Sequence, residues 1–245
     1  MGLAVERFDA RAWRETELHS LFGDAFPPFI IADDVAASYV GPVREWFGEF
    51  NIILVDDQDR PAATGWGVPV CWSGDLTALP VGYTDTLRRA VDAHETGLEC
   101  DTFVICGGIT DRSRTRQGFA GELIIALRDL PAAAGLQRVI APVRPTLKAR
   151  YALTPIDTYA GWTRTDGTPL DPWLRTHVRL GGRIIATAPH SQTMTGTVDQ
   201  WQGWTGMDLP STGHYVIPDG LSTLYVDRER DLGTYIEPNI WVRHR

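Results

Sequence analysis

An apolar run leads through a basic loop into a helical segment, and this order limits the folds open to the chain. Residues 102–110 carry no charged side chain and pass through Gly107 and Gly108, a pattern typical of a buried central strand with a bulge. An arginine-rich loop follows, and from residue 118 to residue 130 apolar side chains recur at helical spacing. This order of strand, loop and helix predicts a mixed α/β fold.

The remaining segments fit such a fold. We expect helices over residues 12–22, 34–50 and 83–98, and over 146–162 with a break at Pro155. Residues 51–56 and 62–70 predict a hairpin, and residues 138–143 predict a second buried strand. Beyond residue 162 we expect strands over 176–187, 193–198, 222–226 and 233–242, with a helical turn at 201–204. Because no internal repeat is present, one mixed domain is favoured over two independent ones.

Charge and lysine content exclude several classes of function. The chain has 23 basic and 31 acidic residues and a formal net charge of −8, so general binding to nucleic acids or anionic membrane surfaces is not expected. Lys148 is the only lysine, so an enzyme that works through a Schiff base would have to use it. We expect no such chemistry.

Cysteine and histidine positions give no sign of a metal site. The three cysteines (Cys71, Cys100 and Cys106) form no C-x-x-C pair, and we expect free thiols in a reducing compartment. The six histidines are scattered, so no metal is expected. With no signal sequence and no apolar run of membrane-spanning length, the expected location is the cytoplasm. The motifs of P-loop enzymes, dinucleotide-binding domains, serine hydrolases and zinc proteases are absent.

The basic loop and the helix that follows it predict an anion site. The loop holds three arginines (Arg112, Arg114 and Arg116), and small residues open the helix (Gly118, Ala120 and Gly121). Free amide groups and the helix dipole at such an N-terminus attract anions, and local arginines strengthen the attraction. The alternative is a solvated basic turn before an ordinary helix. That alternative does not explain the small residues.

The segment Thr115-Arg116-Gln117-Gly118-Phe119-Ala120 resembles the acyl-coenzyme A (acyl-CoA) binding motif of the GNAT superfamily of N-acetyltransferases. In that motif, arginine or glutamine is followed by two residues, glycine, one residue, and glycine or alanine. Gly118 and Ala120 match, whereas Thr115 stands where arginine or glutamine is usual. The segment Tyr159-Ala160-Gly161-Trp162 looks like the close of the family's last core helix. The resemblance covers residues 5–165 as an order of elements and residues 102–130 as a motif.

The resemblance implies an α/β (α+β) fold with a GNAT-like mixed central sheet flanked by helices, in which residues 1–162 would form the acyl-CoA-binding core. After residue 162 it implies only a final pair of strands. The composition of residues 163–245 predicts an enlarged β-rich C-terminal portion that would complete the sheet and could contribute to the acceptor pocket. The central strands would splay after the bulge, and the thioester would lie between them.

The implied reaction is transfer of an acyl group to a small-molecule amine by direct aminolysis. Acetyl-CoA or another acyl-CoA would be the co-substrate, with no metal. The implied donor site consists of Ile109, Thr110, Arg112, Arg114, Arg116, Gln117, Gly118, Phe119, Ala120 and Gly121. An acyl-carrier protein as donor, a hydroxyl acceptor, and a CoA-binding module without turnover remain alternatives, and the oligomeric state stays open.

Direct aminolysis needs an acid for the departing thiolate and a base for the incoming ammonium. The resemblance implies a tyrosine acid, for which Tyr159 is the first candidate and Tyr151 the second; the alternative for each is a packed ring. The base stays open among Asp101, Asp111, His94 and a water chain. Cys106 is expected to be a core residue rather than a covalent acyl carrier.

Aromatic residues are frequent in the C-terminal part: Trp173, Trp201, Trp204, Tyr215 and Trp241. They are interpreted either as walls of an acceptor pocket or, preferably, as the core of a small β-layer. Three arginines (Arg175, Arg179 and Arg183) fall in the expected strand 176–187 or beside it, where they are expected to form a solvated face.

Overall fold

The computed structural model describes residues 2–23, 25–114 and 117–245. Its strands are β1 (Ala4–Arg7), β2 (Asn51–Val55), β3 (Pro61–Val70), β4 (Thr102–Thr110), β5 (Arg138–Val143), β6 (Arg183–Gly196), β7 (Gly213–Val216), β8 (Thr223–Asp227) and β9 (Leu232–Arg243). Within the described residues they form a nine-stranded sheet in the order β1-β2-β3-β4-β5-β9-β8-β7, and β6 pairs with the free edge of β9. The predicted mixed sheet is therefore present.

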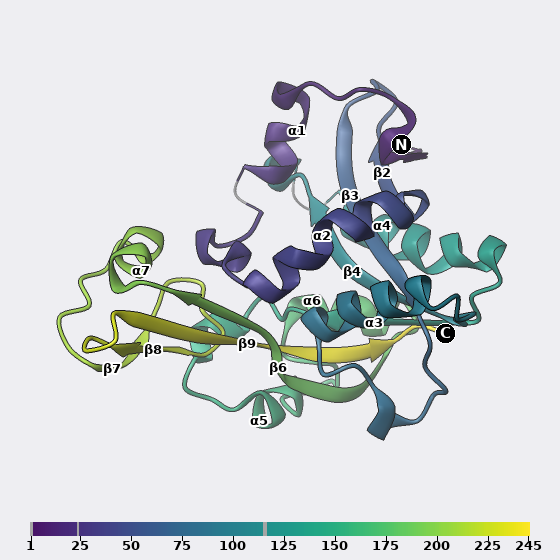
Figure 1. Cartoon of the computed structure of the whole chain (residues 1–245). Coiled ribbons are helices and arrows are strands. Elements are labelled where there is room, and N and C mark those ends of the chain that lie inside the picture. Colours follow the sequence, from purple (N-terminus) through teal and green to yellow (C-terminus); the bar gives the residue numbers. More distant parts are fainter. Residues whose placement is uncertain (1, 24, 115–116) are drawn as a thin grey trace.

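The helices cover both faces of this sheet. They are α1 (Glu15–Phe22), α2 (Asp34–Trp46), α3 (Tyr83–Glu95), α4 (Phe119–Asp129), α5 (Ile156–Ala160), α6 (Pro172–Arg179) and α7 (Val198–Thr205). A side chain at Gly65 of β3 would meet Leu127 and Leu123 of α4, so α4 covers that face. The neighbours Thr64 and Trp66 point to the opposite face because strand side chains alternate. Figure 1 shows α2 and α3 crossing over the central strands.

The central strands separate in the way expected for residues 102–110. β4 and β5 form a parallel pair over only three residues each, ending at Val104 and Ile140. Beyond that point β5 pairs only with β9, on its other edge. β4 also has an irregularity against β3, where Gly67 pairs with Ile105 and Trp66 with Gly107. Cys106 is thus the extra residue of a bulge at the point where the two parallel strands part.

A second core supports the C-terminal strands. Trp201 of α7 is fully buried, and its indole nitrogen donates to the carbonyl of Gly233 at 3.0 Å. Phe29 and Tyr235 pack around it, and Trp204 lies against the same cluster. Trp241 is buried in the main core. These tryptophans are therefore core residues, which agrees with the preferred interpretation of the C-terminal aromatics.

Two expectations about local structure are wrong. Residues 146–162 form a short 3-10 helix (Lys148–Tyr151) and the short α5, which begins directly after Pro155, so the break lies where it was expected but the helical segments are shorter than predicted. The expected strand 176–187 begins with α6, whose N-cap Asp171 accepts hydrogen bonds from the amides of Trp173 and Leu174. An Asp-Pro pair is a helix start signal, and the four-residue spacing of Arg175 and Arg179 also fits a helix. Arg175 and Arg179 therefore lie on a helix.

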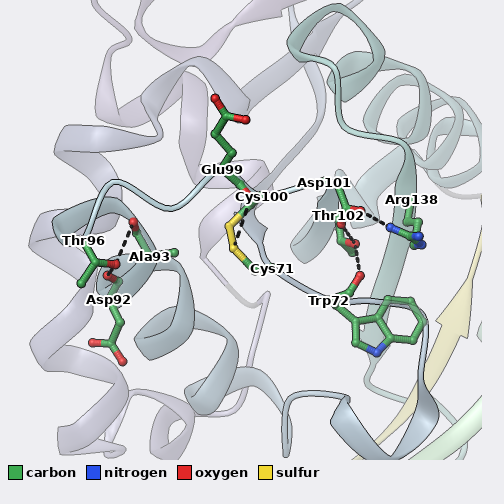
Figure 2. Close-up of a disulfide and its surroundings, with 10 residues drawn as sticks. All are labelled: Cys71, Trp72, Asp92, Ala93, Thr96, Glu99, Cys100, Asp101, Thr102 and Arg138. Carbon is green, nitrogen blue, oxygen red and sulfur yellow. Dashed lines mark hydrogen bonds and ion pairs between the residues drawn. A yellow bond between two sulfur atoms is a disulfide. The ribbon is translucent and has the colours of Figure 1, made fainter.

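The expectation of three free thiols is also wrong. Cys71 and Cys100 form a disulfide, with their Cα atoms 4.3 Å apart (Figure 2). Cys71 follows β3 and Cys100 precedes β4, and the neighbouring residues Val70 and Thr102 are partners in the sheet. Sheet pairing therefore brings together two cysteines that are 29 residues apart. Cys106 is free.

Among the helices of the described segments, none is long and apolar enough to cross a membrane.

Candidate functional site

A cavity of about 740 Å³ lies at the start of α4. We call it the donor cavity. Its lining includes most of the residues predicted to bind the donor: Thr110, Arg114, Gln117, Gly118, Phe119, Ala120 and Gly121. The opposite wall comes from α6, through Thr176, Arg179 and Leu180. The structure thus brings the predicted loop and helix start together around one space.

The first turn of α4 is built to leave amide groups free. Gly118 is its N-cap, with φ of 82°, a left-handed conformation that favours glycine. Because glycine has no side chain, it cannot cap the helix. Within the described chain, the amides of Phe119 and Ala120 have no hydrogen-bond acceptor. Such amides at a helix N-terminus can hold a phosphate group.

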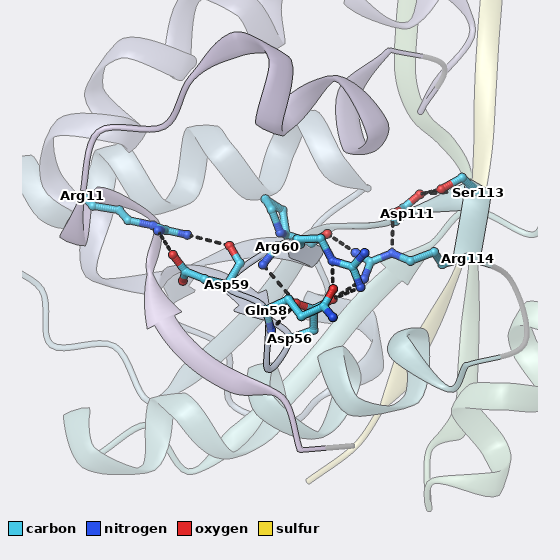
Figure 3. Close-up of polar contacts among 9 residues, drawn as sticks. Arg11, Asp56, Gln58, Asp59, Arg60, Asp111, Ser113 and Arg114 are labelled. Atoms are coloured by element: carbon cyan, nitrogen blue, oxygen red, sulfur yellow. Dashed lines mark hydrogen bonds and ion pairs between the residues drawn. The ribbon is translucent and has the colours of Figure 1, made fainter.

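The guanidinium group of Arg114 forms ion pairs with two carboxylates (Figure 3). Its guanidinium lies 2.7 Å from Asp111 and 2.6 Å from Asp56, and it also donates to the carbonyl of Pro61. Burial alone would raise the pKa of Asp56, but hydrogen bonds from Arg60, Gln58 and Arg114 outweigh burial and hold that pKa below its usual range. Arg114 therefore ties the loop to the β2–β3 hairpin.

The structure adds Arg179 to the cationic groups of the donor cavity. This exposed residue at the end of α6 lines the cavity, and among the described residues it has no carboxylate partner. No sequence pattern pointed to Arg179 as a donor-site residue, because the segment around it was expected to be a strand. Thr115, Arg116 and the side chain of Arg112 lie outside the described part of the chain.

Ile109 is not part of the donor cavity. Its side chain is buried and packs with Leu21 of α1 and Ile53 of β2. It therefore points to the face opposite α4.

Tyr159 lies in α5 and Tyr151 precedes that helix, and neither lines the donor cavity. Tyr159 is buried, at 2% exposure, and its hydroxyl donates to Oδ2 of Asp171 at 2.8 Å. Burial and the nearby carboxylate of Asp171 raise the pKa of Tyr159, so it keeps its proton at neutral pH. The ring of Tyr151 lies 6.1 Å from that of Tyr159 and is exposed at 38%.

The three candidate bases all have other contacts. Asp101 pairs with Arg138 (Figure 2), and Asp111 lines the donor cavity but is paired with Arg114. The ring of His94 stacks on Trp46, with centroids 4.4 Å apart. Burial raises the pKa of the Cys106 thiol to about 12, so Cys106 is a neutral thiol at neutral pH.

A second cavity, of about 600 Å³, lies on the other face of the sheet. We call it the β3–α2 cavity. Thr64, Trp66 and Gly67 of β3 line it, together with residues of α2, Tyr83 of α3 and Phe22 of α1. Trp66 and Gly67 pair with β4 on either side of the bulge at Cys106, so this cavity lies on the β3 side of that bulge. Sequence reasoning missed it because its walls come from segments far apart in the chain.

Another cavity, of about 780 Å³, is lined by residues next to α5 and by strands of the C-terminal part, including His190 and His214. It shares no lining residue with the donor cavity. In the described segments, no group of three or more His, Cys, Asp or Glu side chains is arranged to hold a metal ion.

Comparisons with known proteins agree with this architecture. No protein-family model matches the chain. A protein of Aspergillus versicolor named arginine N-acetyltransferase avaD is 28% identical over 247 residues, covering 89% of this chain and 84% of the relative.

Two solved structures resemble the whole chain. The loading GNATL domain of CurA from Lyngbya majuscula has a TM-score of 0.55 at 13% identity, covering 100% of this chain and 98% of that one. The GphF GNAT-like decarboxylase in complex with isobutyryl-CoA has a TM-score of 0.53 at 14% identity, covering 96% and 97%. At these identities the likeness shows the fold. The predicted GNAT-like fold is confirmed.

Proposed function

We propose that this chain, an acyltransferase of the GNAT superfamily, transfers an acyl group from an acyl-CoA to the amine of a small molecule. Residues 1–162 supply the start of α4 and the splayed strands of the donor site, and residues 163–245 supply Arg179 and complete the sheet. The name of the relative from Aspergillus versicolor favours an amine acceptor. The isobutyryl-CoA bound in the GphF structure favours a CoA donor.

The observation that carries the proposal is the donor cavity. Free amides at the start of α4 face Arg179 across a space next to the end of β4. A pyrophosphate placed there would receive backbone hydrogen bonds and a charge-assisted contact. The pantetheine arm would then run along β4 from Thr110 towards Cys106, as an added strand does.

The proposed chemistry is one displacement at the thioester. The amine nitrogen attacks the carbonyl carbon, the carbon–sulfur bond breaks, and the sulfur leaves as a thiolate. The nitrogen loses a proton to solvent, and the thiolate receives one. We assign the proton donor to Tyr159, because its raised pKa keeps the hydroxyl protonated. Without substrates its O–H donates to Asp171, so in the reaction this proton would turn from Asp171 to the thiolate sulfur, and the phenolate would then take a proton from solvent.

The donor site is tested by filling the donor cavity. Gly121 lies in the first turn of α4, and a side chain there would have no atom within 4 Å of its Cβ. We expect Gly121→Trp to lower CoA affinity at least 10-fold in calorimetry with little change in melting temperature. Gly118 is a poorer position for this test, because its left-handed backbone strains any side chain.

Gly203→Trp is the matched control, since Gly203 lies in a helix, α7, and has equally open surroundings. It should bind CoA as the parent does. Parent-like affinity of Gly121→Trp would overturn the donor site. If the parent protein uses acyl groups only from an acyl-carrier protein, or acylates only hydroxyls, the corresponding alternative replaces this proposal. CoA binding with no thiol released would favour a module without turnover.

A further inference from the structure

We propose that the cavity of about 780 Å³ beside α5 is a second ligand site, which binds a carboxylic acid with an apolar body. We call it the Lys148 cavity. It is separate from the donor cavity, because the two share no lining residue. The inference goes beyond the acyl transfer proposed above and does not depend on it.

Lys148, the only lysine of the chain, forms part of the cavity wall. It is 1% exposed, and its Nζ donates hydrogen bonds to the carbonyls of Tyr151 at 2.8 Å and Leu221 at 2.6 Å. Leu221 and Ala152, the residue after Tyr151, also line the cavity, so the ammonium group lies at its inner wall. An ammonium group has three N–H donors. The described residues accept from two of them, which leaves one for a ligand.

The charge of Lys148 is not balanced by an ion pair. Glu237 attracts it, but this buried carboxylate is paired with Arg144 and accepts a hydrogen bond from Tyr235. Among the described residues, Lys148 has no carboxylate within ion-pair distance. Burial lowers the pKa of Lys148, and Glu237 opposes this shift only in part. A carboxylate bound beside Nζ would form a charge-assisted hydrogen bond and stabilise the charged lysine.

The other charged and ionisable groups of the wall also fit an anion. His190 and His214 line the cavity, and Asp157 is the one carboxylate in the described lining. Asp157 accepts a hydrogen bond from the hydroxyl of Thr187. The described lining contains no arginine, the side chain that pairs with phosphates through two hydrogen bonds. A single ammonium donor therefore favours a carboxylate over a phosphate.

Apolar side chains make up much of the remaining wall, among them Leu153, Pro155, Ile156, Tyr225, Ile236 and Pro238. Leu153 is 77% exposed and Tyr225 is 41% exposed. A ligand with an aromatic or aliphatic body would remove this apolar surface from water. The volume of the cavity lies within the range of pockets that hold small organic molecules. The wall thus favours an acid with an apolar body over a small hydrophilic one.

Calorimetry with two probes of equal size tests the ligand class. Indole-3-acetate carries a carboxylate, and indole-3-acetamide is its neutral counterpart. We expect the parent to bind the acetate at least 10-fold more tightly than the acetamide, with the same affinity when CoA is present in excess. Lys148→Met keeps the length of the side chain and removes its charge, so it should abolish this preference. No binding of indole-3-acetate to the parent, equal affinities for both probes, or competition by CoA would overturn the inference.

A second variant keeps the test valid if Lys148→Met does not fold, since that change leaves two buried carbonyls without their donor. Leu153→Asp adds a carboxylate at an exposed position of the wall, and it should weaken binding of indole-3-acetate at least 5-fold at low ionic strength. Leu98→Asp is the matched control, because Leu98 is 62% exposed and lies outside the Lys148 cavity. Equal losses in both variants, or parent-like binding by Leu153→Asp, would contradict the site.

The outcome is independent of the proposed function. If the parent binds indole-3-acetate through Lys148 but transfers no acyl group from CoA, the proposed function fails alone. If it transfers acyl groups and shows no preference for the acid, only the second site fails.

Discussion

At the scale of single residues, Arg114 and Arg179 line the same cavity but differ in what surrounds their guanidinium groups. Arg114 lies between Asp56 and Asp111, so its charge is largely compensated. Arg179 has no such partner among the described residues. The loop sequence alone ranked Arg114 among the phosphate ligands. The loop sequence could not show that Asp56 compensates the charge of Arg114, because Asp56 is 58 residues away in the chain and only the fold places it beside Arg114.

We therefore expect Arg179→Ala to weaken CoA binding by about 5- to 10-fold at low ionic strength. A charge-assisted contact to phosphate contributes about 1.5–3 kcal/mol when well aligned and less when it is exposed. The loss should shrink as salt is added, because salt screens exposed charges. Calorimetry at two salt concentrations measures it. Arg183→Ala, an exposed arginine outside the cavity, is the control, and an equal loss in both variants would remove Arg179 from the site.

Tyr159→Phe tests the proposed acid. The change deletes the hydroxyl and keeps the ring, so we expect kcat to fall by about 10²-fold, the usual scale for general acid catalysis, with little change in donor KM. The hydrogen bond to Asp171 is also lost, which costs about 1 kcal/mol of stability. If Tyr159 had only a structural role, Tyr159→Phe would lower the melting temperature and leave kcat unchanged. Cys106→Ala should keep most activity, and a dead cysteine variant beside an active tyrosine variant would reverse the assignment.

At the scale of elements, α6 is held to the C-terminal segment by a histidine pair. Nδ1 of His177 lies 2.8 Å from Nε2 of His244, and within the described residues the other ring nitrogens are buried without a partner. Burial lowers the pKa of His177 to about 3 and that of His244 to about 4. Both rings are therefore neutral in the folded protein at pH values where the unfolded chain would protonate them.

The buried histidine pair makes the folded protein less stable at acidic pH. Between pH 6.5 and about pH 4 the unfolded state binds more protons at these two histidines than the folded state, so stability falls as pH falls through this window. We expect the melting temperature to be flat above pH 7 and to decrease steadily below pH 6.5. His177→Phe combined with His244→Phe should make the decrease shallower. His190→Gln, at an exposed position, should leave it unchanged, and an unaltered slope in the double variant would refute the role of the pair.

Helices and strands marked by a clear periodic pattern could be predicted from the sequence. Segments whose pattern fits both a helix and a strand could not. β4 and α4 lie within one or two residues of their expected bounds, because an apolar run and a helical stripe are both local patterns. The expected strand 176–187 is wrong over α6 because arginines four residues apart lie on one face of a helix as well as on one face of a strand. Asp171 caps the segment as a helix and also binds Tyr159.

At the scale of the whole molecule, β9 joins the two parts of the chain. It pairs with β5, β6 and β8, so the C-terminal residues complete the same sheet that holds the donor site. The sequence predicts most of these strands, but pairing between distant strands leaves no periodic pattern. For the same reason the sequence indicated neither the disulfide nor the β3–α2 cavity, whose residues range from Phe8 to Leu87.

Acyl transfer from CoA to an amine is tested by mass spectrometry of both the amines and the protein after incubation with acetyl-CoA and a panel of small-molecule amines. We expect an N-acetylated amine in an amount equal to the CoA thiol released, with no acetyl group left on the protein at any time. Thiol release without an acetylated amine, or an acetyl group held on Cys106, would contradict it.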